Sequence, residues 1–369
     1  MSQDSSSVGD FELRDECCIY QVPHNFRLRK DVYTPLLVSI GPLHFGKVRL
    51  AAMEKQKVKC YEKFCSRLRG NWQEKFMSFL QLHETRIRNT YRYVSETCPL
   101  SSDVFQKMVL YDSIFILEFF FSCHEGAKSG IILNHSLVQE SLIRRDLLLL
   151  ENQLPYFILE KLYKLIFDSG FYISYPSLLS LSCKFLRICM PWDEHEEIKV
   201  AHYTDLLRSA LVGIIPRDLE RSTGKFEGIP TATLLKKSGV RFEKGGCILD
   251  MECTRRNFLL WRCVLTIPHV EVNMSSESIF GNIRALENCG YESMSHHFTN
   301  FLYFMRSLIN SEEDLDLLMT EKVVSNKLGD DAEVVKFFER VADGIAEPEH
   351  GIWCGISDNL NAQVTFRDV

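Results

Sequence analysis

The sequence has no apolar run long enough to cross a membrane, for which roughly 20 mainly apolar residues are needed. Glu118 interrupts the run 114–121, and the run 171–190 contains a proline and two basic residues. Residues 1–16 are acidic and Ser-rich, and they lack the positive start and the apolar stretch of a signal peptide. We therefore expect a soluble protein that is not secreted.

Cysteine pairs with the spacing of a metal site are also missing, although the chain has 13 cysteines. There is no Cys-x-x-Cys pair, and no histidine pair follows Cys183 and Cys189 or Cys247 and Cys253, so we expect no structural zinc. The total is odd, and cysteines such as Cys263 lie in apolar patterns. We therefore expect reduced thiols that pack as small apolar side chains.

The motifs that mark common catalytic and nucleotide-binding sites are absent as well. Ser39 does not lie in a G-x-S-x-G motif, and Gly224-Lys225 lacks the preceding glycine of a phosphate-binding loop. His296 and His297 are adjacent at an expected helix start, so their rings would point in different directions. We predict no catalytic residue, no metal site and no small-molecule cofactor.

The sequence is instead rich in aromatic residues and in helical periodicity. It contains 25 Phe and 13 Tyr, which favour a packed interior. Apolar spacing predicts helices over about 47–69, over 76–94, from Ser101 or Ser102 onward, and from Ser136 onward with a kink or break at Pro155. The fold class we predict is mainly α: a compact multi-helix globular domain.

The second half is expected to mix helices with a small β region. Short β-prone stretches fill 240–272, and Gly245-Gly246 between two of them suggests a hairpin. Ser311 followed by Asp314 has the pattern of a capping box for a helix that ends near Gly329. Further helices are expected over the following ranges: 195–211, 231–237, from 275 onward and from 331 onward.

Positive charge is concentrated near the N-terminus. The formal net charge is −6, yet residues 26–92 carry 15 Lys and Arg against five Asp and Glu. One interpretation is a basic face that binds an anionic surface, either lipid or nucleic acid. The other is that these helices pack beside the acidic remainder and neutralise it, with the rest of the charge on solvated faces.

Several segments together resemble one known family. They are CCIYQVP, YTPLLVSIGPLHFG with LAAMEKQK, RRDLLLLENQLPYFIL, IPTATLLKKSGVRF, SSESIFGNIRALENCG and FMRSLINSEEDLDLL. Their order and spacing are similar to those of the plant domain-of-unknown-function 247 family. The resemblance implies a plant protein with a mostly helical domain and no assigned catalytic residues. It also implies a C-terminal membrane helix in relatives, some of which are implicated in self-incompatibility.

The C-terminus is where the chain is expected to depart from that family. The resemblance divides the chain into a flexible leader 1–16, one domain 17–345 and a divergent polar tail 346–369, which lacks the apolar segment that would form the anchor. We therefore expect this chain to be cytoplasmic, or peripheral at the plasma membrane.

The most informative polar residues are carboxylates and arginines within apolar helices. A carboxylate in such a place must be paired or protonated, because burying it alone costs several kcal/mol. One interpretation is a buried network that fastens the third predicted helix to the fourth. The other is acid–base catalysis by carboxylates with separated pKa values. The network candidates are Asp112, Glu118, Arg144, Arg145, Asp146 and Glu151.

These observations favour a non-enzymatic protein-interaction, signalling or recognition module whose partner is a protein or peptide. The first alternative is an enzyme of unknown reaction that uses Asp112, Glu118 and Glu151. The second is binding of lipid or nucleic acid through the basic N-terminal helices. Nucleic acid is the less favoured of these, since the chain is acidic overall and contains no RNA-binding module.

Overall fold

A computed structural model gives the fold of most of the chain, and the predicted leader 1–16 lies outside the residues it describes. The described residues are 17–27, 29–68, 70–92, 100–125, 137–168, 175–189, 199–213, 226–257, 262–289, 296–348 and 352–367.

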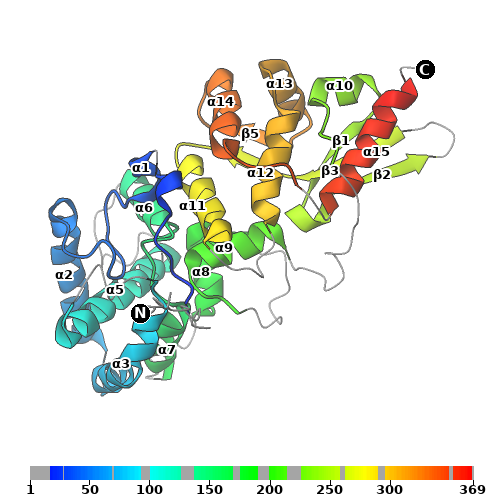
Figure 1. Ribbon diagram of the computed structural model, residues 1–369. Helices are drawn as coiled ribbons and strands as arrows, with labels where there is room; N and C mark the ends of the chain where they lie inside the picture. The colour runs from blue at the N-terminus through cyan, green and yellow to red at the C-terminus, as the bar shows by residue number, and fades with distance from the viewer. Residues whose placement is uncertain are drawn as a thin grey trace, which may run out of the picture.

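Helices dominate, so the prediction of a mainly α fold is confirmed (Figure 1). The first half consists of the helical elements η1 His24–Phe26, α1 Lys30–Tyr33, η2 Val48–Leu50, α2 Ala51–Arg67, α3 Trp72–Asn89, α5 Ser102–Glu125, α6 Leu137–Asp146, α7 Tyr156–Asp168, α8 Leu178–Leu186 and α9 Tyr203–Val212.

Helix α5 is the centre of this half. It packs against α2, α3, α7 and α8, and most of its residues are buried on every side, as expected of a helix that is apolar all round. The fourth predicted helix is divided into α6 and α7, and the break is wider than a kink at Pro155. Residues 147–155 between them are not helical, and within this stretch Glu151 and Asn152 bond to the backbone of another segment, as described below.

The second half combines helices with two small sheets. Its elements are α10 Ala232–Lys237, β1 Arg241–Gly245, η5 Ile248–Asp250, β2 Glu252–Asn257, β3 Arg262–Pro268, β4 Val270–Val272, α11 Ser276–Asn288, α12 His297–Leu308, α13 Glu312–Thr320, β5 Val324–Asn326, α14 Asp331–Ala342 and α15 Ile352–Arg367.

The predicted hairpin at Gly245-Gly246 is wrong. Strand β1 pairs in parallel with β3, and β2 pairs with β3 in the antiparallel sense, which gives the order β1-β3-β2. The stretch after the glycines turns into η5, where Asp250 accepts a hydrogen bond from the Cys247 amide at 3.0 Å. Parallel β4 and β5 form the second sheet. Ser311 caps α13 as predicted, but that helix ends at Thr320.

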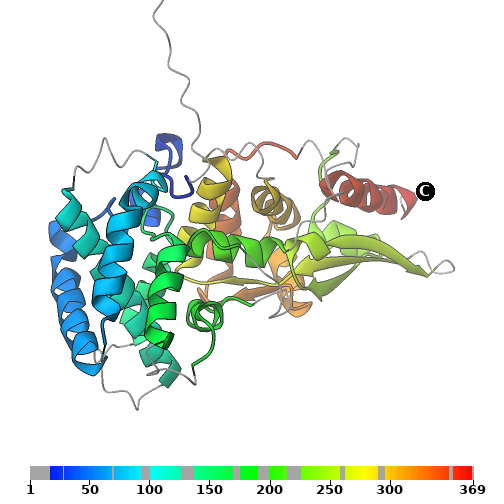
Figure 2. The same cartoon turned by 90° about the horizontal axis from the view of Figure 1, so that it is seen from below.

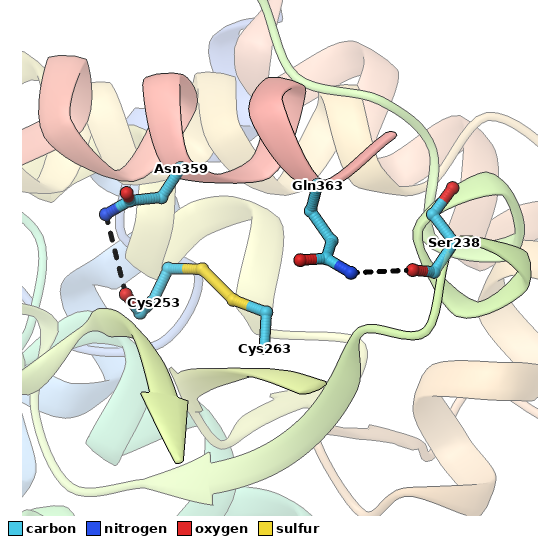
Figure 3. The surroundings of a disulfide bond; sticks show 5 residues. All are labelled: Ser238, Cys253, Cys263, Asn359 and Gln363. Atoms are coloured by element: carbon cyan, nitrogen blue, oxygen red, sulfur yellow. Dashed lines mark hydrogen bonds between the residues drawn. A yellow bond between two sulfur atoms is a disulfide. The ribbon is translucent and has the colours of Figure 1, made fainter. Parts of the chain in front are cut away.

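The predicted polar tail contains helix α15, which packs against β2 and α10 (Figure 3). Trp353, Ile356 and Leu360 recur at helical spacing and are buried, so the polar residues between them hide an amphipathic pattern. Beneath the helix, Cys253 and Cys263 form a disulfide between β2 and β3. The prediction that the cysteines stay reduced is wrong for this pair.

The described residues form two main hydrophobic cores, one built from residues 19–210 and one from 212–360, and the second includes residues of the predicted tail 346–369. In Figures 1 and 2 they lie at opposite ends of an elongated molecule, with α9 and α11 between them. Buried polar contacts join the halves: the Arg208 Nε donates to Glu287 Oε1 at 2.9 Å. Asn282 accepts from the Leu150 amide at 2.8 Å and donates to the Val32 carbonyl at 3.1 Å.

Candidate functional site

A fully buried ion pair joins α2 to α5. The Lys57 Nζ lies 2.5 Å from Asp112 Oδ1 and 2.6 Å from Glu54 Oε1, and the Lys57 and Asp112 side chains are each 1% exposed. The other Asp112 oxygen accepts a hydrogen bond from the Gly41 amide at 2.8 Å. Burial raises the pKa of Asp112 to about 6, although Lys57 opposes the shift. Each charge therefore depends on the other to remain in the interior.

Glu118 makes the second ion pair of α5, and its partner is Arg67 at the end of α2. The Glu118 side chain is 1% exposed, and burial raises its pKa while the Arg67 guanidinium lowers it. The sequence predicts a network between the third predicted helix, which is α5, and the fourth, which is α6 and α7. Asp112 and Glu118 instead both pair with cations of α2, Lys57 and Arg67.

Asp146 at the end of α6 binds backbone rather than another helix. Its carboxylate accepts hydrogen bonds from the amides of Leu36, Leu37 and Val38 at 3.0, 2.7 and 3.0 Å. The Arg145 Nη1 lies 2.8 Å from the same carboxylate, which is completely buried. Burial raises the pKa of Asp146, and the three amides and Arg145 act against that rise. An irregular segment of chain is thus held by one side chain.

The two adjacent arginines have different surroundings. Arg145 is buried and reaches both halves, donating to Ser278 Oγ at 3.0 Å and to the Thr34 carbonyl at 3.2 Å. Arg144 points elsewhere and donates to Glu140 and to the Phe185 carbonyl, both at 2.7 Å. The structure therefore places Arg145 with Asp146 and leaves Arg144 outside that group.

Glu151 binds the N-terminal segment that contains Val22 and Arg27. It accepts a hydrogen bond from the Val22 amide at 2.7 Å, pairs with Arg27, and lies 3.4 Å from the Nε2 of the buried His44. Burial lowers the pKa of His44, against the effect of Glu151. The carboxylate is only 4% exposed, so its oxygens face these partners.

Asn152 and Gln153 complete the same motif. The Asn152 carbonyl oxygen accepts from the Ile40 amide at 2.7 Å, and its amide group donates to the Val38 carbonyl at 3.0 Å. The Gln153 backbone oxygen lies so close to Gly41 that a Cβ there would come within 2.4 Å, and Gly41 has a φ of +70°. Only glycine fits that position without strain.

Side chains of the motif RRDLLLLENQLP thus bind the backbone of the motif YTPLLVSIG. The sequence alone did not reveal this pairing. Arg145, which pairs with Asp146, was among the predicted network residues, but the cations that pair with Asp112, Glu118 and Glu151 were not singled out. Lys57 carried a usable signal, because it lies four residues after Met53 and seven before Phe64, both buried on the core face of α2. The partners Arg27, His44 and Arg67 carried no comparable signal.

Two surface hollows lie away from these carboxylates. The smaller, of about 150 Å³, is formed by α5, α6 and α8 and includes Arg144 and Arg187. The larger is a cleft of about 620 Å³ between the segment 25–33, α11, α12 and the end of α14. None of Asp112, Glu118 and Glu151 lines either hollow, so these carboxylates do not meet in a shared, solvent-connected cavity there.

The basic residues of the N-terminal region have two kinds of surroundings. Lys57, Arg27, Arg67 and Arg88 are in ion pairs with acidic residues. A second group is exposed on η2 and α2 or just before them: Lys47, Arg49, Lys55, Lys59 and Lys63.

Within the described part of the chain, no group of three or more His, Cys, Asp and Glu residues is placed to hold a metal ion. The same residues form no helix that combines the length and the apolar character needed to cross a membrane.

Comparison with known proteins gives one family and two relatives. The model of a family described as plant protein of unknown function, DUF247, matches residues 19–365. The chain is 28% identical over 369 residues to the UPF0481 protein At3g47200 of Arabidopsis thaliana, covering 90% of this chain and 74% of that protein. It is 31% identical over 132 residues to the putative UPF0481 protein At3g02645 of the same plant, covering 36% of this chain and 24% of that protein.

No solved structure is significantly similar to the chain. The family match continues to residue 365 and so includes α15. The match therefore extends beyond Ile345, the residue at which the resemblance was expected to end.

Proposed function

We propose that this chain, which belongs to the DUF247 family of plant proteins of unknown function, is a non-enzymatic module that binds a protein or peptide partner. The observation that carries the proposal is the burial of Asp112, Glu118 and Glu151, each held by internal cations or backbone amides. A general acid or base must come within hydrogen-bond reach of its substrate. These carboxylates serve the fold, which leaves the surface for recognition.

The alternative is an enzyme that uses the same three carboxylates. Raised pKa values at Asp112 and Glu118 suit acid–base chemistry, but burial of a structural ion pair raises a pKa in the same way. What an enzyme would need in addition is a cavity that opens onto the carboxylates, and neither surface hollow provides it. Interaction is therefore the better supported function.

Proximity labelling in native plant tissue tests this proposal, followed by calorimetry with each purified candidate partner. We expect at least one labelled protein to bind the purified chain directly, with saturation at a fixed stoichiometry. A matched arm incubates the chain with a metabolite extract of the same tissue. The proposal fails if no candidate binds the purified chain. It also fails if a metabolite is converted by the wild type but not by a folded Glu118→Gln variant.

A further inference from the structure

We propose that the 620 Å³ cleft between the segment 25–33, α11, α12 and the end of α14 is the docking site for a short acidic peptide segment of a partner protein. The inference rests on the proposed interaction function and names where that interaction occurs. The cleft volume falls within the range of about 300–1,000 Å³ typical of ligand sites, which often lie between structural units. Here the cleft is shared by elements of both halves.

The cleft contains four arginines, and two of them already have an acidic partner. Arg29 pairs with Glu277, and the Arg340 Nε lies 3.6 Å from the other oxygen of that carboxylate. In the part of the chain that the structure describes, Arg284 and Arg306 have no acidic residue at ion-pair distance. Each guanidinium is a planar set of donors that matches a carboxylate with two parallel hydrogen bonds. The cleft thus offers two cationic positions to an anionic ligand.

Arg284 has an unfilled hydrogen-bonding position as well as a charge. Its Nη1 donates to the Val341 carbonyl at 3.1 Å, and its guanidinium lies 5.0 Å from the ring centre of Phe26. Its Nε is buried and has no hydrogen-bond partner in the described structure. A buried donor without an acceptor is costly, so native structures supply one from protein, water or ligand. Because Arg284 lines the cleft, a ligand carboxylate bound there would place an anionic acceptor beside its guanidinium.

The other residues that line the cleft indicate which kind of anionic ligand fits it. Phe26, Val32 and Tyr33 line the cleft beside the arginines, so the site suits apolar side chains as well as charge. A concave site of this size fits a peptide better than a flat lipid surface. Glu339 and Asp343 are exposed at the same cleft, and they would repel a long acidic run. The partner segment that fits best therefore carries one or two carboxylates next to an aromatic or aliphatic residue.

Fluorescence anisotropy with the purified full chain tests this site. The probe is a fluorescein-labelled hexapeptide amide with two glutamates flanking a phenylalanine and a leucine. Arg306 is exposed, so Arg306→Gln should fold normally. We expect this variant to raise the Kd of the probe about tenfold or more, because a charge-assisted contact is lost. Arg187→Gln, which removes an exposed arginine of the other hollow, should leave the Kd unchanged.

Several outcomes would overturn the inference. One is equal binding by wild type and Arg306→Gln, and another is equal weakening by Arg187→Gln. A third is displacement of the probe by inorganic phosphate at the same concentration, which would indicate a small-anion site. The partner found by labelling separates the two proposals: if it binds Arg306→Gln as well as wild type, the cleft is wrong and the interaction function stands. If no partner exists, the interaction function itself is wrong.

Discussion

Replacing Lys57 with methionine is expected to lower the free energy of unfolding by about 3–5 kcal/mol, the usual cost of removing one partner from a buried ion pair. Asp112 would remain in the core with the Gly41 amide as its closest remaining donor. The variant would also lose the contacts of the Lys57 Nζ with Glu54 and with the Ser39 carbonyl. Chemical denaturation followed by circular dichroism measures the loss.

The double variant Lys57→Met with Asp112→Leu should regain at least about 2 kcal/mol of that loss, because no charge is then left buried. Recovery is incomplete, since the Gly41 amide loses its acceptor. Lys55→Met on the exposed face of the same helix is the matched control and should change stability by no more than about 0.5 kcal/mol. Equal stability of Lys57→Met and Lys55→Met would refute the buried pair.

Asp146→Ala is expected to lower the free energy of unfolding by at least about 4 kcal/mol. Three backbone amides would lose their acceptor, and each buried, unsatisfied donor costs roughly 1–3 kcal/mol. Arg145 would also lose its carboxylate. Asp146→Asn should cost less, because one carbonyl oxygen remains to accept part of these hydrogen bonds.

The control for that series is Asp316→Ala, which removes an exposed carboxylate from the middle of α13. It should change the free energy of unfolding by no more than about 0.5 kcal/mol. If Asp146→Ala were as mild as Asp316→Ala in the same denaturation experiment, the segment 36–38 would not depend on Asp146.

Helical periodicity predicted most of the helices because amphipathic or wholly apolar runs report burial locally. The runs that became α2, α3 and α5 were found in this way, and Ser311 was a correct capping signal for α13. The parallel pairing of β1 with β3 could not be found, since it joins strands about 20 residues apart through the intervening η5 and β2. Short β-prone runs next to Gly-Gly favour a hairpin on local grounds alone.

The candidate site was predictable in its residues but not in its contacts. An acidic residue within an apolar helix indicates a required partner, which correctly drew attention to Asp112 and Glu118. Which cation pairs with that carboxylate depends on helix packing: Arg67, the partner of Glu118, lies 51 residues away from it in the sequence. Asp146, Glu151 and Asn152 bind backbone amides of another segment. Every residue type offers such an amide except proline, so sequence carries little trace of that pairing.

The central claim is that Asp112, Asp146 and Asn152 hold the irregular segment 36–41 in place rather than performing chemistry. Amide hydrogen exchange of that segment tests this claim most directly. Free irregular segments exchange quickly, but these amides donate to Asp146, Asn152 and Asp112. We predict exchange at Leu37, Val38, Ile40 and Gly41 slowed about a thousandfold or more relative to an unstructured peptide, with Asp146→Ala, which removes the acceptor of the first two, releasing those two. Exchange at unstructured-peptide rates in the wild type would contradict the account.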